Sequence, residues 1–245
     1  MGTLIMIKHR HRTGVQRLSR SGFADVCAFF DVDGTLWNEK SVLSFYERFL
    51  EHEFGEGAKQ AWAQFLDELK RLQDNNTPRD RLNEWFYGKY FCGVAVSRIA
   101  GVARAWWHQR VSRSDFWIEA VVRQAREHHR NGHELVLVTG SFREVVDPLI
   151  DYLGASHALL TPLEEIEGIY TGRLNGAPMI GEGKGRAVAA YMRARGIDPK
   201  RSYGYGDDES DLPFLERVAN PVVVVNGSSP LARIARTRNW SVLQW

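Results

Sequence analysis

Short apolar runs alternate with longer segments of helical periodicity along this chain. Residues 26–30, 135–138 and 221–225 are unbroken apolar runs, which are typical of strands buried on both faces of a sheet. Residues 157–161 and 202–206 predict two shorter strands, and residues 164–175 predict an exposed hairpin. Apolar residues three and four positions apart predict the intervening helices, at 114–131, 144–153, 181–195, 212–218 and 230–238. Strands separated by helices predict an α/β fold, with a Rossmann-like parallel sheet covered by helices on both faces.

A purely helical stretch interrupts this alternation after the first strand. Apolar spacing predicts helices at 41–54, 58–72, 78–90 and 94–109, with Thr77 as the N-cap of the third and Pro78 at its first position. We expect residues 38–118 to form an inserted, all-helical cap, and residues 25–37 and 119–245 to form the core. The aromatic residues of the insertion are interpreted as core side chains and not as a ligand cage: Trp62, Trp85, Phe86, Tyr87, Trp106 and Trp107.

Two carboxylates end the first predicted strand. Asp31 and Asp33 are two residues apart, so they leave the strand on the same side. Acids this close repel each other unless a cation or protons compensate, which favours a functional site. A solvated Asp turn ahead of Gly34 is the alternative, and the pair alone does not decide between them.

Other polar residues follow the later strands. Thr139 ends one apolar run, Asp207 and Asp211 follow another strand, and Lys184 lies among glycines at the start of a helix. Ligands of parallel sheets bind beyond the carboxyl ends of the strands. Hard carboxylate oxygens suit Mg²⁺, whereas a hydroxyl, backbone amides and an ammonium suit a phosphate. Structural alternatives remain for Thr139 as a strand cap and for Asp211 as the N-cap of the next helix.

Composition narrows the class of protein. The chain has 44% hydrophobic and 25% charged residues and a net charge of +2, as ordinary globular proteins do. Residues 1–24 hold five Lys or Arg and no acid, which leaves 27 basic against 30 acidic residues in the remainder. We interpret this basic N-terminal extension as a loosely packed leader, with nucleic acid or anionic lipid as the alternative partner. No apolar stretch reaches the ~20 residues of a membrane span. Two cysteines predict no disulfide framework and a cytoplasmic location.

Two further patterns are given no catalytic role. The glycine-rich segment 181–185 is not a nucleotide P-loop, because Gly185 occupies the position of the required Ser or Thr. His128, His129 and His133 are interpreted as surface residues and not as metal ligands, because adjacent helical residues face different directions.

In order and spacing, these residues resemble the haloacid dehalogenase superfamily of aspartate-nucleophile phosphatases. Residues 31–35 match its Asp-x-Asp-x-Thr motif, and Thr139 matches the Ser or Thr that closes a hydrophobic strand. Lys184 matches the helix-start lysine, and residues 206–211 match the acidic Gly-Asp-x-x-x-Asp turn. The position of the helical insertion resembles the C1 cap of the phosphoserine phosphatase-like branch, subfamily IB.

The resemblance implies a role for each matched residue. Asp31 is expected to be the nucleophile that forms an aspartyl-phosphate, and Asp33 the general acid and base. Mg²⁺ is expected to bind Asp31, the backbone carbonyl of Asp33 and Asp207, with Asp211 in support. Substrate phosphate is expected to contact the remaining residues, which are Thr139, the Gly140 amide, Lys184 and, less directly, Arg143.

The expected activity is Mg²⁺-dependent hydrolysis of a small phosphorylated metabolite. Phosphoserine itself is disfavoured, because Lys40 aligns with the Glu that holds its amino group and Ser210 replaces a usual Asn. The alternatives are a phosphotransferase with the same intermediate, a phosphoserine phosphatase proper, and a non-enzymatic phospho-aspartate switch or nucleic-acid binder. The cap is expected to decide between substrates.

Overall fold

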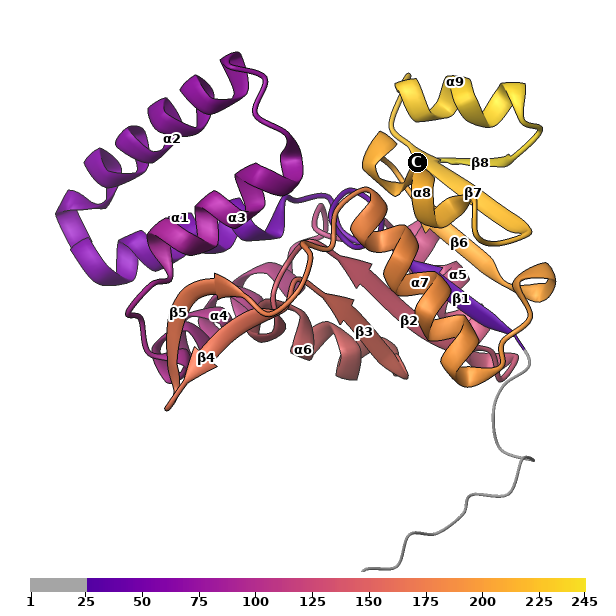
Figure 1. Cartoon of the computed structure of the whole chain (residues 1–245), viewed down its shortest axis with the longest axis horizontal. Helices are drawn as coiled ribbons and strands as arrows, with labels where there is room; N and C mark the ends of the chain where they lie inside the picture. The colour runs from indigo at the N-terminus through magenta and orange to yellow at the C-terminus, as the bar shows by residue number, and fades with distance from the viewer. Residues whose placement is uncertain (1–25) are drawn as a thin grey trace, which may run out of the picture.

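The computed structural model of the protein describes residues 26–245, so the predicted basic extension at 1–24 lies outside the described residues. Its centre is a parallel six-stranded sheet in the order β3-β2-β1-β6-β7-β8 (Figure 1). The strands are β1 (Cys27–Phe30), β2 (Glu134–Thr139), β3 (His157–Leu160), β6 (Tyr203–Gly206), β7 (Asn220–Val225) and β8 (Ser241–Gln244). The predicted α/β fold is confirmed.

Helices cover both faces of this sheet. The side chains of β1 point alternately to the two faces, and each face has its own buried cluster. Ala28 and Phe30 belong to one buried cluster, whereas Cys27 and Phe29 belong to the other. Helices α5 (Glu119–Arg130) and α6 (Arg143–Leu153) supply the first cluster. Helices α7 (Glu182–Arg195), α8 (Leu212–Leu215) and α9 (Pro230–Thr237) supply the second.

Four helices occupy the predicted insertion and lie to one side of the sheet (Figure 1). They are α1 (Ser41–Phe54), α2 (Ala58–Asp74), α3 (Arg79–Tyr90) and α4 (Val96–Val111), and α4 packs on both α1 and α6. An antiparallel hairpin of β4 (Leu163–Ile166) and β5 (Ile169–Leu174) packs against α3. Short 3₁₀ turns occupy Gly55–Gly57, Pro199–Arg201 and Glu209–Asp211. We call α1–α4 the cap, and its division from the core at 38 and 118 stays a prediction.

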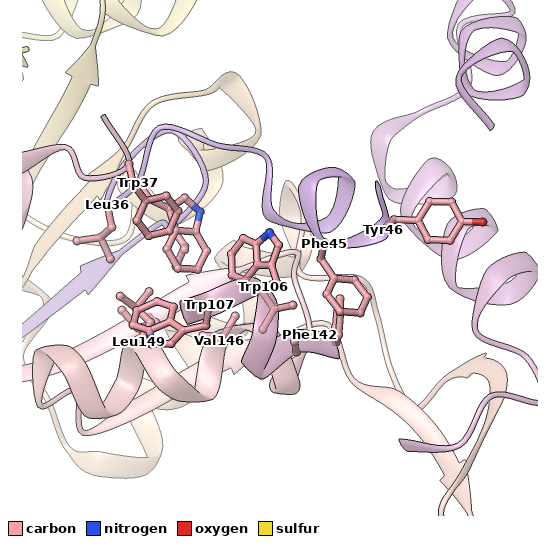
Figure 2. Close-up of a cluster of buried hydrophobic side chains, with 14 of the residues drawn as sticks. Leu36, Trp37, Phe45, Tyr46, Trp106, Trp107, Phe142, Val146 and Leu149 are labelled. Carbon is pink, nitrogen blue, oxygen red and sulfur yellow. The ribbon is translucent and has the colours of Figure 1, made fainter. Parts of the chain in front are cut away.

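A buried aromatic cluster joins the cap to the core (Figure 2). The ring of Trp106 meets Trp37 edge to face, with centroids 5.7 Å apart, and its indole N–H donates to Ser44 Oγ at 2.6 Å. Phe45 of α1 packs similarly on Phe142 of the core at 5.1 Å. The predicted core role is confirmed for Phe86, Tyr87, Trp106 and Trp107, which are all buried. Trp62 and Trp85 are only half-buried.

Several local predictions are wrong, among them the helix expected from residue 114, which begins only at Glu119. His128 is buried and not on the surface, because it continues the buried stripe of Val121 and Ala125 on α5. Its ring nitrogens lie 2.7 Å from His133 Nδ1 and 2.9 Å from the Tyr205 hydroxyl. Helix α3 begins one residue late, because Pro78 has an extended ψ of 148° and takes the N-cap position. The edge strand β8 was not predicted, since its mostly exposed residues form no apolar run. Among residues 26–245, no helix is both long and apolar enough to cross a membrane.

Candidate active site

The two carboxylates after β1 line the same cavity but have different partners. Asp31 is buried, and its amide N–H donates to the carbonyl oxygen of Tyr205 at 2.9 Å. The carboxylate of Asp33 accepts hydrogen bonds from the indole of Trp37 at 2.6 Å and from the amide and hydroxyl of Ser41, both at 3.0 Å. Burial, and secondarily the charge of Asp31, raise the pKa of Asp33 above its ordinary value. Asp33 therefore links the first strand to the first turn of the cap.

The turn after these carboxylates brings the chain against Asp207. Gly34 has a φ of +91°, and a Cβ at this position would collide with the carboxylate of Asp207. The next residue, Thr35, donates its hydroxyl to Asp207 Oδ1 at 3.2 Å. A glycine followed by a threonine thus provides both the space and the hydrogen bond that position Asp207.

Lys184 forms a buried ion-pair network with two carboxylates. Its ammonium donates to Asp31 Oδ1 and, at 2.7 Å, to Asp211 Oδ1, and all three side chains are at most 6% exposed. Burial alone would lower the pKa of Lys184, but the charges of Asp211 and Asp31 raise it overall. Gly183, in the first turn of α7, packs directly against the backbone carbonyl of Pro178. Any larger residue would place a Cβ in collision with that carbonyl.

Asp211 organises the acidic loop after β6 instead of capping the following helix. Its Oδ2 accepts the amide N–H groups of Asp207 and Asp208, both at 3.1 Å, and its side chain makes no cap hydrogen bond to α8. Burial, then the charge of Asp31, raise the pKa of Asp211 to about 6. The same two causes raise the pKa of Asp207 to about 8. In both groups burial and a neighbouring carboxylate disfavour the charged form, so positive charge nearby would stabilise it.

A divalent cation would supply that charge. Carboxylate oxygens of Asp31, Asp207 and Asp211 lie within 4.8 Å of one another. All three donors are hard oxygens, which suit a cation such as Mg²⁺ better than thiolates or imidazoles would. The residues after β1 and β6 therefore fit a metal site, and the set of ligands expected from the family resemblance stays a prediction.

The loop after β2 contributes a hydroxyl and a restrained peptide. Thr139 is buried, and its Oγ1 accepts the amide N–H of Ser141 at 3.1 Å. The carbonyl of Gly140 accepts three hydrogen bonds, from Asn83 at 3.0 Å, Tyr87 at 3.1 Å and Thr161 at 3.0 Å. Two of these donors come from α3, so the cap holds the orientation of the Gly140 peptide.

A cavity of about 460 Å³ is lined by every site residue predicted from the sequence except Arg143. We call the part of the cavity lined by Asp31, Asp33, Thr139, Lys184 and Asp207 its floor, and residues of α1, α2 and α3 line the cap side. Gly140 and Asp211 also line it. Arg143 lies exposed at the first position of α6 and does not line the cavity, so we assign it no role.

Sequence reasoning missed several residues that complete the cavity. Lys40 was recognised only as a departure from the family pattern, yet its ammonium donates to the carbonyl of Asp33 at 3.0 Å and lies 3.7 Å from Asp207 Oδ2. Arg79 of α3 pairs with Asp208 and bonds Ser210 Oγ at 3.2 Å, which connects the cap to the acidic loop. No local pattern distinguishes Arg79 from the neighbouring surface arginines.

Comparison with known proteins agrees with this arrangement. Residues 28–216 match the family described as haloacid dehalogenase-like hydrolase. The chain is 30% identical over 229 residues to "Probable phosphatase Rv3661" of Mycobacterium tuberculosis, covering 91% of this chain and 76% of that protein. It is 27% identical over 243 residues to a histidinol-phosphatase of Neisseria meningitidis, covering 89% and 98% of the two chains.

Solved structures show the same fold. A Bordetella pertussis protein of unknown function aligns with a TM-score of 0.78 and 26% identity, over 90% of this chain and 98% of that one. A phosphoserine phosphatase in the form of a phospho-aspartyl intermediate analogue aligns with a TM-score of 0.61 and 13% identity, over 90% and 92% of the two chains. Sequence, fold and the convergence of four motifs on one cavity place this chain in the haloacid dehalogenase-like hydrolase family.

Proposed function

We propose that the protein is a Mg²⁺-dependent phosphatase that hydrolyses a small phosphomonoester through an aspartyl-phosphate on Asp31. One observation carries the proposal: the strand-end carboxylate of Asp31 contacts the ammonium of Lys184 inside a cavity that also holds Thr139 and Asp207. This set combines a nucleophile, a cation and phosphate-binding groups. Relatives named as phosphatases support the reaction class.

Asp31 attacks phosphorus in the first half of the reaction, forming a bond from its carboxylate oxygen as the ester P–O bond breaks. Asp33 gives its proton to the departing alkoxide, which leaves as an alcohol. In the second half, Asp33 removes a proton from the water that attacks the aspartyl-phosphate. Inorganic phosphate leaves and the Asp31 carboxylate is regenerated.

The remaining residues hold and neutralise the phosphoryl group. The Thr139 hydroxyl and the Gly140 amide would bind its oxygens, and Lys184 would offset negative charge on both Asp31 and phosphate. Mg²⁺, bound by Asp31, the Asp33 carbonyl and Asp207 with Asp211 in support, would supply electrostatic stabilisation of the transferring group. An anionic nucleophile could otherwise not approach an anionic substrate.

Substitution of the nucleophile tests the proposal. Asp31→Asn should abolish continuous, Mg²⁺-dependent phosphate release from p-nitrophenyl phosphate, because an amide cannot form the aspartyl-phosphate. Asp67→Asn, an exposed acid on α2, is the control and should keep full activity. Near wild-type turnover by folded Asp31→Asn would contradict the nucleophile assignment. Adding glycerol and measuring glycerol phosphate would separate a phosphotransferase from a hydrolase.

A further inference from the structure

We propose that the cap side of the catalytic cavity binds an uncharged, ring-bearing leaving group of the phosphomonoester. This inference rests on the proposed function and adds the chemical class of its substrate. We call the cap-side wall the leaving-group wall and define it by Leu43, Phe65, Leu69, Leu82, Trp85 and Phe86.

The leaving-group wall belongs to the same cavity as the reacting groups. One continuous space of about 460 Å³ extends from Asp31 and Lys184 to helices α1, α2 and α3. This volume lies within the range of about 300–1,000 Å³ that is usual for small-molecule sites. A phosphoryl group held by Thr139 and Lys184 occupies only the floor, so an alcohol esterified to it must extend along the wall.

The wall offers aromatic surface chiefly through Trp85, because Phe65 and Phe86 are only 2% and 3% exposed. The rings of Phe65 and Trp85 stack with an interplanar angle of 11° and centroids 6.0 Å apart. Phe65 also packs against Tyr46 and Tyr90, whose ring centroids lie 4.9 Å and 5.4 Å away. Trp85 remains half-buried although it lines the cavity. Rigid, preformed aromatic faces favour a second ring over a flexible chain.

The charged groups of the cavity already have partners within it. Lys184 pairs with Asp31 and Asp211, as described above, and Arg79 pairs with Asp208. Lys40 is 3.7 Å from Asp207 Oδ2. The neutral Asn83 is also engaged, through the Gly140 carbonyl. The six residues of the leaving-group wall are apolar, and the charged side chains of Lys40 and Arg79, which line the same cavity beside them, face Asp207 and Asp208. A charged group buried against the six apolar residues would lose hydration without an ionic partner.

Lys40 further disfavours amino alcohols as leaving groups. Its ammonium lines the cavity, where it donates to the carbonyl of Asp33 at 3.0 Å and lies 3.7 Å from Asp207 Oδ2. A substrate ammonium close to the ester would therefore meet a like charge, whereas a neutral ring would not.

The test compares phosphate esters of primary alcohols, which share the same type of ester oxygen. We expect kcat/KM for 2-phenylethyl phosphate to exceed that for ethyl phosphate about 10²-fold, because the added ring is removed from water. Phosphoethanolamine should be a poorer substrate than ethyl phosphate. Equal kcat/KM for ethyl and 2-phenylethyl phosphate would overturn the proposal, and hexyl phosphate as good as the phenyl ester would overturn the ring selectivity.

A substitution in the leaving-group wall tests whether the wall causes this preference for the phenyl ester. Trp85→Ala should reduce the advantage of the phenyl ester over the ethyl ester to less than about tenfold. Trp240→Ala, a half-buried tryptophan outside the cavity, is the matched control and should keep it. An unchanged advantage in folded Trp85→Ala would contradict the assignment.

Two readouts keep the inference separate from the proposed function. Turnover of ethyl phosphate without a preference for the ring would leave the phosphatase assignment intact and reject the leaving-group wall. The inhibition constants of 2-phenylethylphosphonate and ethylphosphonate can be compared on the wild-type protein, without any variant. The phenyl compound should bind about 10²-fold more tightly, and equal inhibition constants would again reject the wall.

Discussion

Replacing Lys184 by Met tests the buried ion-pair network most directly. Lys184, Asp31 and Asp211 have side chains that are 5%, 6% and 1% exposed, so little water can compensate for a lost partner. Removing one member of a buried ion pair typically lowers the free energy of unfolding by about 3–5 kcal/mol. In a chain of this length, that corresponds to a fall in Tm of about 6–20 °C.

The assay is urea unfolding followed by tryptophan fluorescence at pH 7.5 in the presence of EDTA. Lys89→Met is the matched control, because Lys89 forms an exposed ion pair with Glu68 and its loss should change the free energy of unfolding by less than about 1 kcal/mol. Asp211→Asn added to Lys184→Met should restore part of the loss, since one uncompensated carboxylate is then removed. A double-mutant cycle should give a coupling energy of about 1–3 kcal/mol.

The pH dependence provides an independent check on the Lys184 network. Burial and the charge of Asp31 already raise the folded-state pKa of Asp211, and loss of the ammonium should raise it further. The folded state then holds more protons than the unfolded one, and its stability falls as pH rises through the folded-state pKa of Asp211. Lys184→Met should therefore be least destabilising near pH 5 and most destabilising near pH 8. Unfolding free energies of Lys184→Met and Lys89→Met that agree at pH 7.5 would refute the reasoning.

Three further predictions concern the metal site and α5. Mg²⁺ at 100 times its Kd should stabilise the fold by about 2.7 kcal/mol, measured as a rise in Tm of about 5–10 °C, and Asp207→Asn should remove most of that rise. Gly34→Ala should weaken the same Mg²⁺-dependent rise, because its Cβ would displace the Asp207 carboxylate; an unaltered Mg²⁺ response would exclude that contact as a constraint. Burial, and secondarily the neighbouring His133, lower the pKa of His128 to about 4. Between pH 6.5 and 4 the unfolded state therefore binds more protons than the folded state, and the free energy of unfolding decreases as pH falls through that range. His128→Gln should lessen this acid-induced loss, by at most about 3 kcal/mol in urea unfolding, whereas exposed His108→Gln should not.

The parts of the fold that could be predicted are those that depend on residues close together in the sequence. The apolar runs of β1, β2 and β7 identify buried parallel strands, because a strand covered on both faces buries side chains on both of its sides. Every residue of β1 and β2 is buried, and so are four of the six residues of β7. Strand β8 was missed because an edge strand pairs on one side only and needs no such run. His128 was misplaced because neighbouring histidines conceal the seven-residue spacing that connects it to Val121.

The candidate site was predictable as a set of residue types at strand ends. Asp31, Asp33, Thr139 and Asp207 follow apolar runs, and parallel strands bring their carboxyl ends to one edge. This physical rule assembles the floor of the cavity without any knowledge of side-chain packing. The substrate-facing wall has no equivalent rule, since apolar residues on a helix look alike whether they face a core or a cavity.

Sequence pattern therefore determines the sheet, its helical insertion and the chemistry at the strand ends, because each depends on residues close together in the chain. Tertiary packing decides the partners of those groups. Lys184 reaches Asp31 across 153 residues, and Arg79 reaches Asp208 across 129. Tyr87 reaches the Gly140 carbonyl across 53. Such contacts depend on how α3 and α7 pack against the sheet, so periodicity cannot predict them. They determine which charges of the cavity are neutralised.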